Sequence, residues 1–154
     1  MNQYSRKSSG IALVLTLGAG LAALAGTGQF RAGDPGSVDQ LERAIASGHG
    51  DVHTWAAYGA ALQEQKRFDH AAQAYQRALD LQPDPADAQK IRFNAALCFG
   101  QAGDADKFFD FFSHLTTTNP KLAVDVLERP ELTPLHSDAR WGPAASLARA
   151  QAAD

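Results

Sequence analysis

The chain has only one cysteine, Cys98, among its 154 residues. A single cysteine cannot form a disulfide within the chain, so the hydrophobic core must stabilise the fold unaided. A lipid anchor on a cysteine after the apolar run of residues 11–25 is excluded, because no cysteine stands there. Cys98 lies between Leu97 and Phe99 with no adjacent basic group, so we expect a buried, unreactive thiol.

The sequence also lacks a strong charge of either sign. It has 14 lysines and arginines against 17 aspartates and glutamates, and its formal net charge is -3. A nucleic-acid-binding protein carries a clustered basic face, which is missing here, so we expect no nucleic-acid partner. The hydrophobic share of 45% suits one compact domain.

Motifs for catalysis and for metal or cofactor binding are missing too. There is no Gly-x-Ser-x-Gly elbow and no glycine-rich loop followed by a lysine. His49 and His53 are four residues apart with Asp51 between them, but the glycines around His49 place the helix start after it. No second histidine pair or cysteine cluster completes a zinc site. The sequence predicts no enzyme, no metal and no cofactor, and an enzyme using the histidines is the least favoured hypothesis.

The first 25 residues are predicted to direct export. Arg6 and Lys7 precede the apolar run of 11–25, which ends in the small residues around Ala25, as in a secretory signal peptide. An uncleaved N-terminal membrane anchor is the alternative, because residues 8–30 carry no charge and about 20 apolar residues can span a bilayer. The positive amino terminus stays cytoplasmic in both cases. We therefore expect a periplasmic or secreted domain, or one anchored in the inner membrane and lying outside the cytoplasm.

A folded domain is predicted over residues 37–154, after a glycine-containing linker at 26–36. Apolar residues at helical spacing predict a first helix at 38–46, with Ser37 as its N-cap and Gly48 as its stop. This helix would be half of an incomplete leading repeat.

Two further helices, predicted at 51–65 and 68–81, share a distinctive set of offsets. The set is Trp55, Tyr58, Gly59, Leu62, Ala71, Tyr75, Ala78 and Pro83. It resembles the tetratricopeptide repeat pattern almost position for position. The resemblance implies an antiparallel helix pair over residues 52–85, in which Gly59 and Ala71 allow close approach. The predicted fold is therefore all-α, an α-solenoid of about two such repeats with helical caps.

A second, degenerate repeat is predicted at residues 89–122, where Pro120 aligns with Pro83. Phe108 stands where Ala71 does, so bulk moves from the first helix of the pair to the second. Four phenylalanines between 108 and 112 give this second helix aromatics on more than one face, and we expect some to contact the next element. The predicted helices span 86–101 and 104–117.

Residues 123–154 are predicted to form a C-terminal cap. The pattern indicates a short helix at 122–127, a turn-rich stretch at 132–141 and a final helix at 143–153. A solenoid needs a terminal element that covers its last apolar face, and Leu135, Trp141 and Leu147 are the predicted cover. Residues 130–141 also resemble the tails that follow the last repeat in bacterial tetratricopeptide proteins.

The resemblance implies a binding surface, because the first helix of each repeat in this family lines the concave face. The candidates are the residues opposite the packing stripe: His53, Ala57, Ala60, Gln63 and Glu64 in the first repeat, and Lys90, Phe93, Asn94, Leu97 and Gln101 in the second. We expect Phe93 and Leu97 to bury apolar area against a partner, while the Asn94 amide holds backbone groups.

The predicted function is a protein-protein interaction adaptor in the cell envelope, which binds a peptide or partner helix in the concave groove. Membrane contact is expected only through the N-terminal segment. The alternative is a structural or assembly subunit packed permanently in a larger envelope complex, where other subunits would cover the aromatic second repeat and the tail.

Overall fold

The computed structural model describes residues 35–153, and the predicted export segment at 1–25 lies outside them. The described residues form helices and no strand. They comprise α1 (Pro35–Ala46), α2 (Val52–Glu64), α3 (Phe68–Asp80), α4 (Pro85–Ala102), α5 (Ala105–Thr118), α6 (Pro120–Leu127), the 3-10 helix η1 (Pro130–Ser137) and α7 (Trp141–Ala152).

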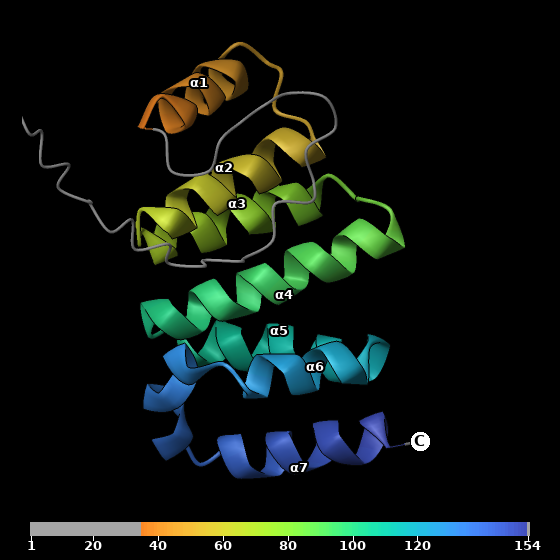
Figure 1. Ribbon diagram of the computed structural model, residues 1–154. Coiled ribbons are helices and arrows are strands. Elements are labelled where there is room, and N and C mark those ends of the chain that lie inside the picture. The colour runs from red at the N-terminus through yellow and green to blue at the C-terminus, as the bar shows by residue number, and fades with distance from the viewer. Residues whose placement is uncertain (1–34, 154) are drawn as a thin grey trace, which may run out of the picture.

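The helices stack in layers from α1 at one end to α7 at the other (Figure 1). Each of α2, α3, α4 and α5 packs against the helix before it and the helix after it. The contacts follow the order of the chain, which is the arrangement of a solenoid. The predicted all-α solenoid is therefore confirmed.

Capping residues set where the helices begin. The carboxylate of Asp51 accepts a 2.7 Å hydrogen bond from the backbone N–H of Thr54 at the start of α2. Asp84 accepts from two backbone N–H groups at the start of α4, directly before Pro85. Asn119 accepts from one backbone N–H group, that of Leu122, at the start of α6, and it also stands directly before a proline. A capping side chain followed by proline satisfies exposed N–H groups and presets the backbone for a helix.

The first helix starts earlier than the sequence indicates. We expected a linker as far as residue 36 and an N-cap at Ser37, whereas α1 begins at Pro35. The periodicity of apolar residues starts only at Val38, so it misses the first turn, and proline is favoured at the first position of a helix. Val38 and Leu41 are buried against α2, and Tyr58 on α2 donates a 2.7 Å hydrogen bond to Glu42 on α1.

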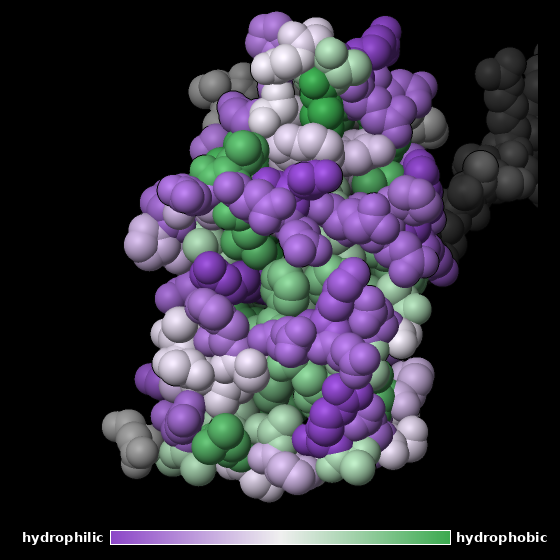
Figure 2. Space-filling view, turned by 180° about the vertical axis from the view of Figure 1, so that it is seen from behind, coloured by the Kyte–Doolittle hydropathy of each residue, from purple (hydrophilic) through white to green (hydrophobic). Residues whose placement is uncertain are grey.

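Close packing of α2 on α3 rests on one glycine. A Cβ built at Gly59 would lie 3.0 Å from two ring carbons of Tyr75 on α3. Ala71 and Ala78 are fully buried in the same contact. Seen from behind, the molecule's surface is mostly hydrophilic, with hydrophobic side chains in small scattered areas (Figure 2).

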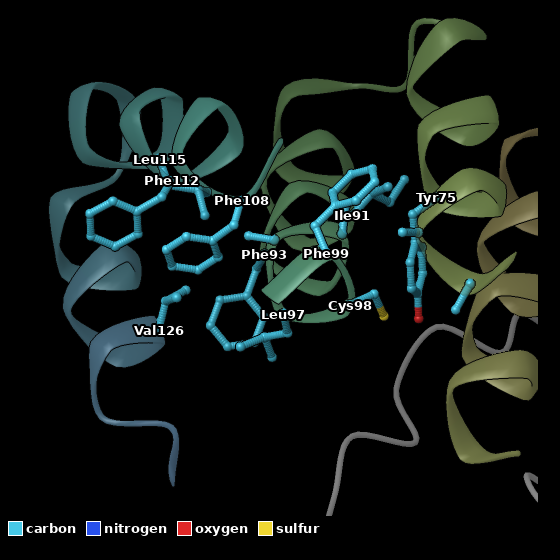
Figure 3. Close-up of a cluster of buried hydrophobic side chains, with 14 of the residues drawn as sticks. Tyr75, Ile91, Phe93, Leu97, Cys98, Phe99, Phe108, Phe112, Leu115 and Val126 are labelled. Carbon is cyan, nitrogen blue, oxygen red and sulfur yellow. The ribbon is translucent and has the colours of Figure 1, made fainter. Parts of the chain in front are cut away.

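The second helix pair contributes more of the core than the first pair does. Phe108 and Phe112 on α5 are buried and stack with ring centroids 5.6 Å apart (Figure 3). Phe108 also stacks on Trp141 of α7 at 5.9 Å. Phe108 of the aromatic cluster therefore contacts an element beyond its own helix pair, as expected, but that element is α7 and not the helix directly after α5. The outer members of the cluster are only half-buried, and Phe111 lies 5.2 Å from Phe99 on α4.

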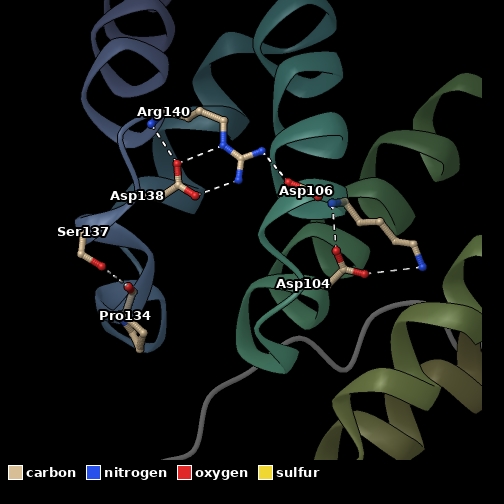
Figure 4. Close-up of polar contacts among 7 residues, drawn as sticks. Asp104, Asp106, Pro134, Ser137, Asp138 and Arg140 are labelled. Atoms are coloured by element: carbon tan, nitrogen blue, oxygen red, sulfur yellow. Dashed lines mark hydrogen bonds and ion pairs between the residues drawn. The ribbon is translucent and has the colours of Figure 1, made fainter.

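Beyond Pro120 the chain adds a third, irregular layer. The turn-rich stretch contains η1, whose Leu132 and Leu135 are buried against the C-terminal end of α4. A salt-bridge cluster then fixes the entry into α7 (Figure 4): Arg140 binds both carboxylate oxygens of Asp138 and reaches Asp106 on α5 at 2.7 Å. The Arg140 guanidinium also lies 4.5 Å above the ring of Phe109. These contacts hold α7 as the last layer.

One predicted cover residue is placed differently. Leu135 is buried and Trp141 half-buried, as the capping role requires, but Leu147 remains 54% exposed. The inner face of α7 consists of Trp141 together with Ala145 and Ala148, both of them buried. Residue 147 lies on the other side of the helix from this stripe, so its side chain cannot pack inward.

Candidate functional site

The candidate site is the face formed by α2 and α4, the first helices of the two successive pairs. Both helices pack against α3, which lies between them in the order of the chain. On α2, residues 53, 57, 60 and 64 follow one another at steps of three or four and share one face. His53, Ala60 and Glu64 are exposed and Ala57 is half-buried. This stripe is open and shallow, and two of its four side chains are those of alanine.

Gln63 takes part in the packing of the first helix pair. Its side-chain oxygen accepts a 3.2 Å hydrogen bond from the hydroxyl of Tyr75 on α3. Tyr75 is buried, and burial raises the pKa of its phenol, so the group donates as a neutral hydroxyl. Gln63 therefore orients Tyr75, and its amide nitrogen is the part of the side chain left for a partner.

The predicted residues of α4 divide into two groups. Lys90 is exposed, while Asn94 and Gln101 are half-buried. Lys90 pairs with Asp87, one turn earlier, through a 3.4 Å contact. These three polar residues are the accessible part of the predicted face on α4.

Phe93 and Leu97 do not belong to the open face, which corrects the prediction that they bury area against a partner. They are 8% and 5% exposed. Figure 3 shows the Phe93 ring directed from α4 toward Val126 on α6, with the Leu97 side chain beside it. The guanidinium of Arg129 lies over the Phe93 ring, 5.5 Å from its centroid. The third layer therefore occupies the space in which we expected a peptide.

Arg129 is a residue that the sequence alone did not single out. It lies two residues after the end of α6 and directly precedes Pro130, so it falls outside the helical periodicity of α6. Together with Asp125, Glu128 and Pro130 it lines an open depression of about 280 Å³. This depression lies beside the covered Phe93, and its lining is charged.

The titratable groups give the face no reactive centre. Burial raises the pKa of Cys98 to about 12, so this thiol stays protonated at neutral pH. The Asp51 carboxylate accepts a hydrogen bond from the Thr54 N–H, which lowers its pKa and reflects a capping role. Within residues 35–153, no group of three His, Cys, Asp or Glu side chains could hold a metal ion. Nor is any helix of this part long and apolar enough to cross a bilayer.

Residues 52–85 match a family model described as a tetratricopeptide repeat. The match spans α2, α3 and the turn that leads into α4. A search of curated proteins gave no match, and neither did a search of solved structures.

Proposed function

Because residues 52–85 are a tetratricopeptide repeat, a unit that in general binds other proteins, we propose that this chain is a protein-protein interaction adaptor. The observation that carries the proposal is the open stripe on α2, formed by His53, Ala57, Ala60 and Glu64. It belongs to the first helix of the matched repeat, and His53, Ala60 and Glu64 are exposed.

The proposed ligand is an extended segment of a partner protein. The alanines of the stripe have little side chain, so a partner backbone can lie close to α2. Lys90, Asn94 and Gln101 continue the face on α4 and offer an ammonium group and two amides. Amides can donate to and accept from a peptide backbone at once, which suits recognition of an extended chain.

The alternative function is a subunit buried permanently in a larger complex. It was suggested by the aromatic second repeat and the tail, which other subunits would cover. The aromatic second repeat is covered within the chain itself, since Phe108 and Phe112 are buried against α4, α6 and α7. Leu132 and Leu135 of the tail are likewise buried against α4. Neither group requires another subunit.

We further propose that the adaptor works without catalysis and outside the cytoplasm. The inert Cys98 and the shallow, polar face support the first point. The sequence of residues 1–25 supports the second, through its two basic residues and its apolar run. Fusion of a reporter enzyme that folds only in an oxidising compartment, placed after residue 154, tests the location. Activity of the fusion is expected, and an inactive but intact fusion contradicts it.

Site-specific crosslinking in intact cells tests the binding face. A photoreactive residue at Ala60 of the full chain is expected to capture a partner protein, while the same residue at exposed Gln76 on α3 serves as the matched control. A bulky charge nearby, Ala57→Arg, is expected to abolish capture at position 60 and leave the helical content unchanged. Equal capture at positions 60 and 76, or capture at 60 that survives Ala57→Arg, refutes the assignment of this face.

A further inference from the structure

The side chain of Arg129 is an exposed cover on a buried ring. Its guanidinium lies 5.5 Å from the centroid of Phe93, and this cation–π contact is what holds it there. Among the described residues, it forms no salt bridge with Asp125, with Glu128 or with any other carboxylate. An exposed cation on an aromatic face is held weakly. The guanidinium can therefore leave the ring at little cost.

The backbone of Arg129 stays in place when the side chain moves. Its N–H donates a 3.2 Å hydrogen bond to the carbonyl oxygen of Val126, in the last turn of α6. The next residue is Pro130, and proline restricts the residue before it to extended backbone, as the φ of -79° and ψ of 116° of Arg129 show. Rotation of the side chain alone is therefore enough to free one face of the Phe93 ring.

The depression beside this ring is acidic apart from Arg129 itself. Asp125 and Glu128 are exposed, and with Arg129 and Pro130 they line its volume of about 280 Å³. It lies at the C-terminal end of α6, whose last turn has no basic residue, and a helix C-terminus favours a cation. The volume lies below the usual range of small-molecule pockets, about 300 to 1,000 Å³, which favours a single long side chain as the occupant.

We propose, resting on the function proposed above, that this depression receives an arginine side chain of the partner segment, which replaces Arg129 on the Phe93 ring. The ring already holds a guanidinium, so the structure shows which group this face accepts. The exchange keeps that contact and adds attraction to Asp125 and Glu128, because the incoming group enters the depression while Arg129 turns into water. Hydrogen bonds between a guanidinium and a carboxylate are among the strong ones in proteins.

The depression adjoins the face along which the partner segment is proposed to lie. Helix α4 packs against α6, and α2, α4 and α6 run in the same direction (Figure 1). Phe93 is one turn from Lys90 and next to Asn94, two polar residues of the proposed site on α4. Its ring is directed toward Val126 on α6 (Figure 3). A segment that crosses from α2 to α4 therefore reaches the depression next.

Titration of the full chain with two short peptides, followed by NMR of the backbone amides, tests this subsite. The probes are Gly-Ala-Arg-Ala-Gly with blocked ends and a matched control in which neutral citrulline replaces the arginine. The arginine peptide is expected to shift the amide resonances of Asp125 and Glu128, and the citrulline peptide is not. Arg129→Gln removes the internal competitor and should strengthen binding of the arginine peptide severalfold, whereas Glu128→Gln should weaken it severalfold. Asp110→Asn controls for net charge, because Asp110 is exposed on α5 and does not line the depression.

The proposal is overturned by equal shifts from the two peptides or by no shift from either. It is also overturned if Arg129→Gln binds the arginine peptide no more tightly than the unaltered chain, or if Glu128→Gln behaves like Asp110→Asn. Photocrosslinking at Ala60 tests the adaptor function separately. Capture at Ala60 without binding of the arginine peptide overturns this subsite alone, whereas binding of the arginine peptide without capture contradicts the adaptor face and supports the subsite.

Discussion

Gly100 is the tightest point at which the third layer meets the solenoid. A Cβ built at this position would lie 2.3 Å from Cδ2 of Leu132 in η1 and 3.2 Å from side-chain carbons of both Leu135 and Phe108. Leu132 and Phe108 are fully buried, so neither can turn into solvent. Gly100→Ala must therefore push η1 away from α4 or disturb the rotamers of the core.

The expected cost follows from two opposing effects. Alanine in a helix is favoured over glycine by about 1 kcal/mol. Overpacking of a buried site costs about 1 to 3 kcal/mol, and a 2.3 Å approach places this site toward the upper end. The net loss should be about 1 to 2 kcal/mol in the free energy of unfolding, measured by urea denaturation followed by circular dichroism.

Two other glycines provide a graded control. At Gly59 the added Cβ would touch the Tyr75 ring at 3.0 Å, so Gly59→Ala should cost less than Gly100→Ala. At Gly142 nothing lies within 4 Å, so Gly142→Ala should be neutral or slightly stabilising. A Gly100→Ala variant as stable as Gly142→Ala would refute the close packing of η1 on α4.

Other substitutions test separate features. Lys66 and Gln82 have positive φ values of 58° and 56°, a backbone conformation that strains residues with a Cβ but not glycine. Lys66→Gly and Gln82→Gly should therefore each raise the free energy of unfolding by up to about 1 kcal/mol. Gln76→Gly, within the regular helix α3, should not. Hydrogen bonds from Arg140 lower the pKa of Asp138 to about 2, so the charged contact stabilises the folded state. This contribution is complete above pH 3.8, the ordinary pKa of the aspartate, and is lost as the pH falls from 3.8 to about 2. Asp138→Asn should flatten the dependence of stability on pH in that window, and an unchanged dependence contradicts the contact. Cys98 should react with a thiol reagent only at the rate of unfolding, and rapid labelling of the native protein would show that α4 opens locally.

Regular helices were predictable from the sequence because their signals are local. Capping residues, prolines and apolar periodicity gave the two pairs α2–α3 and α4–α5 with ends within about two residues. The start of α1 was missed because Pro35 precedes the first periodic apolar residue. The 3-10 helix η1 has no periodicity that separates it from a series of turns, so only its turn-rich character was predictable.

The binding face was harder to predict, because burial depends on elements distant in the sequence. Helical spacing correctly places residues 90, 94, 97 and 101 on one side of α4. It does not show that α6 and η1 cover part of that side. The covering residues, Val126 and Arg129, come about 30 residues later, after the predicted second repeat has ended (Figure 3). The α2 stripe could be predicted as open because the matched repeat positions fix its orientation, and no later element reaches it.

The replacement of Ala71 by Phe108 connects the packing of the second pair with the position of the open face. A phenylalanine at this position needs space, and Gly100 on α4 provides part of it, since a Cβ there would lie 3.2 Å from the Phe108 ring. The Phe108 ring stacks on both Phe112 and Trp141, and the contact with Trp141 packs α7 against α5. With α7 held there, η1 must cross the end of α4, and Leu132 fills the place beside Gly100. The same difference that weakens the repeat pattern thus accompanies the burial of Phe93 and Leu97, and the proposed partner site is limited to α2 and the polar residues of α4.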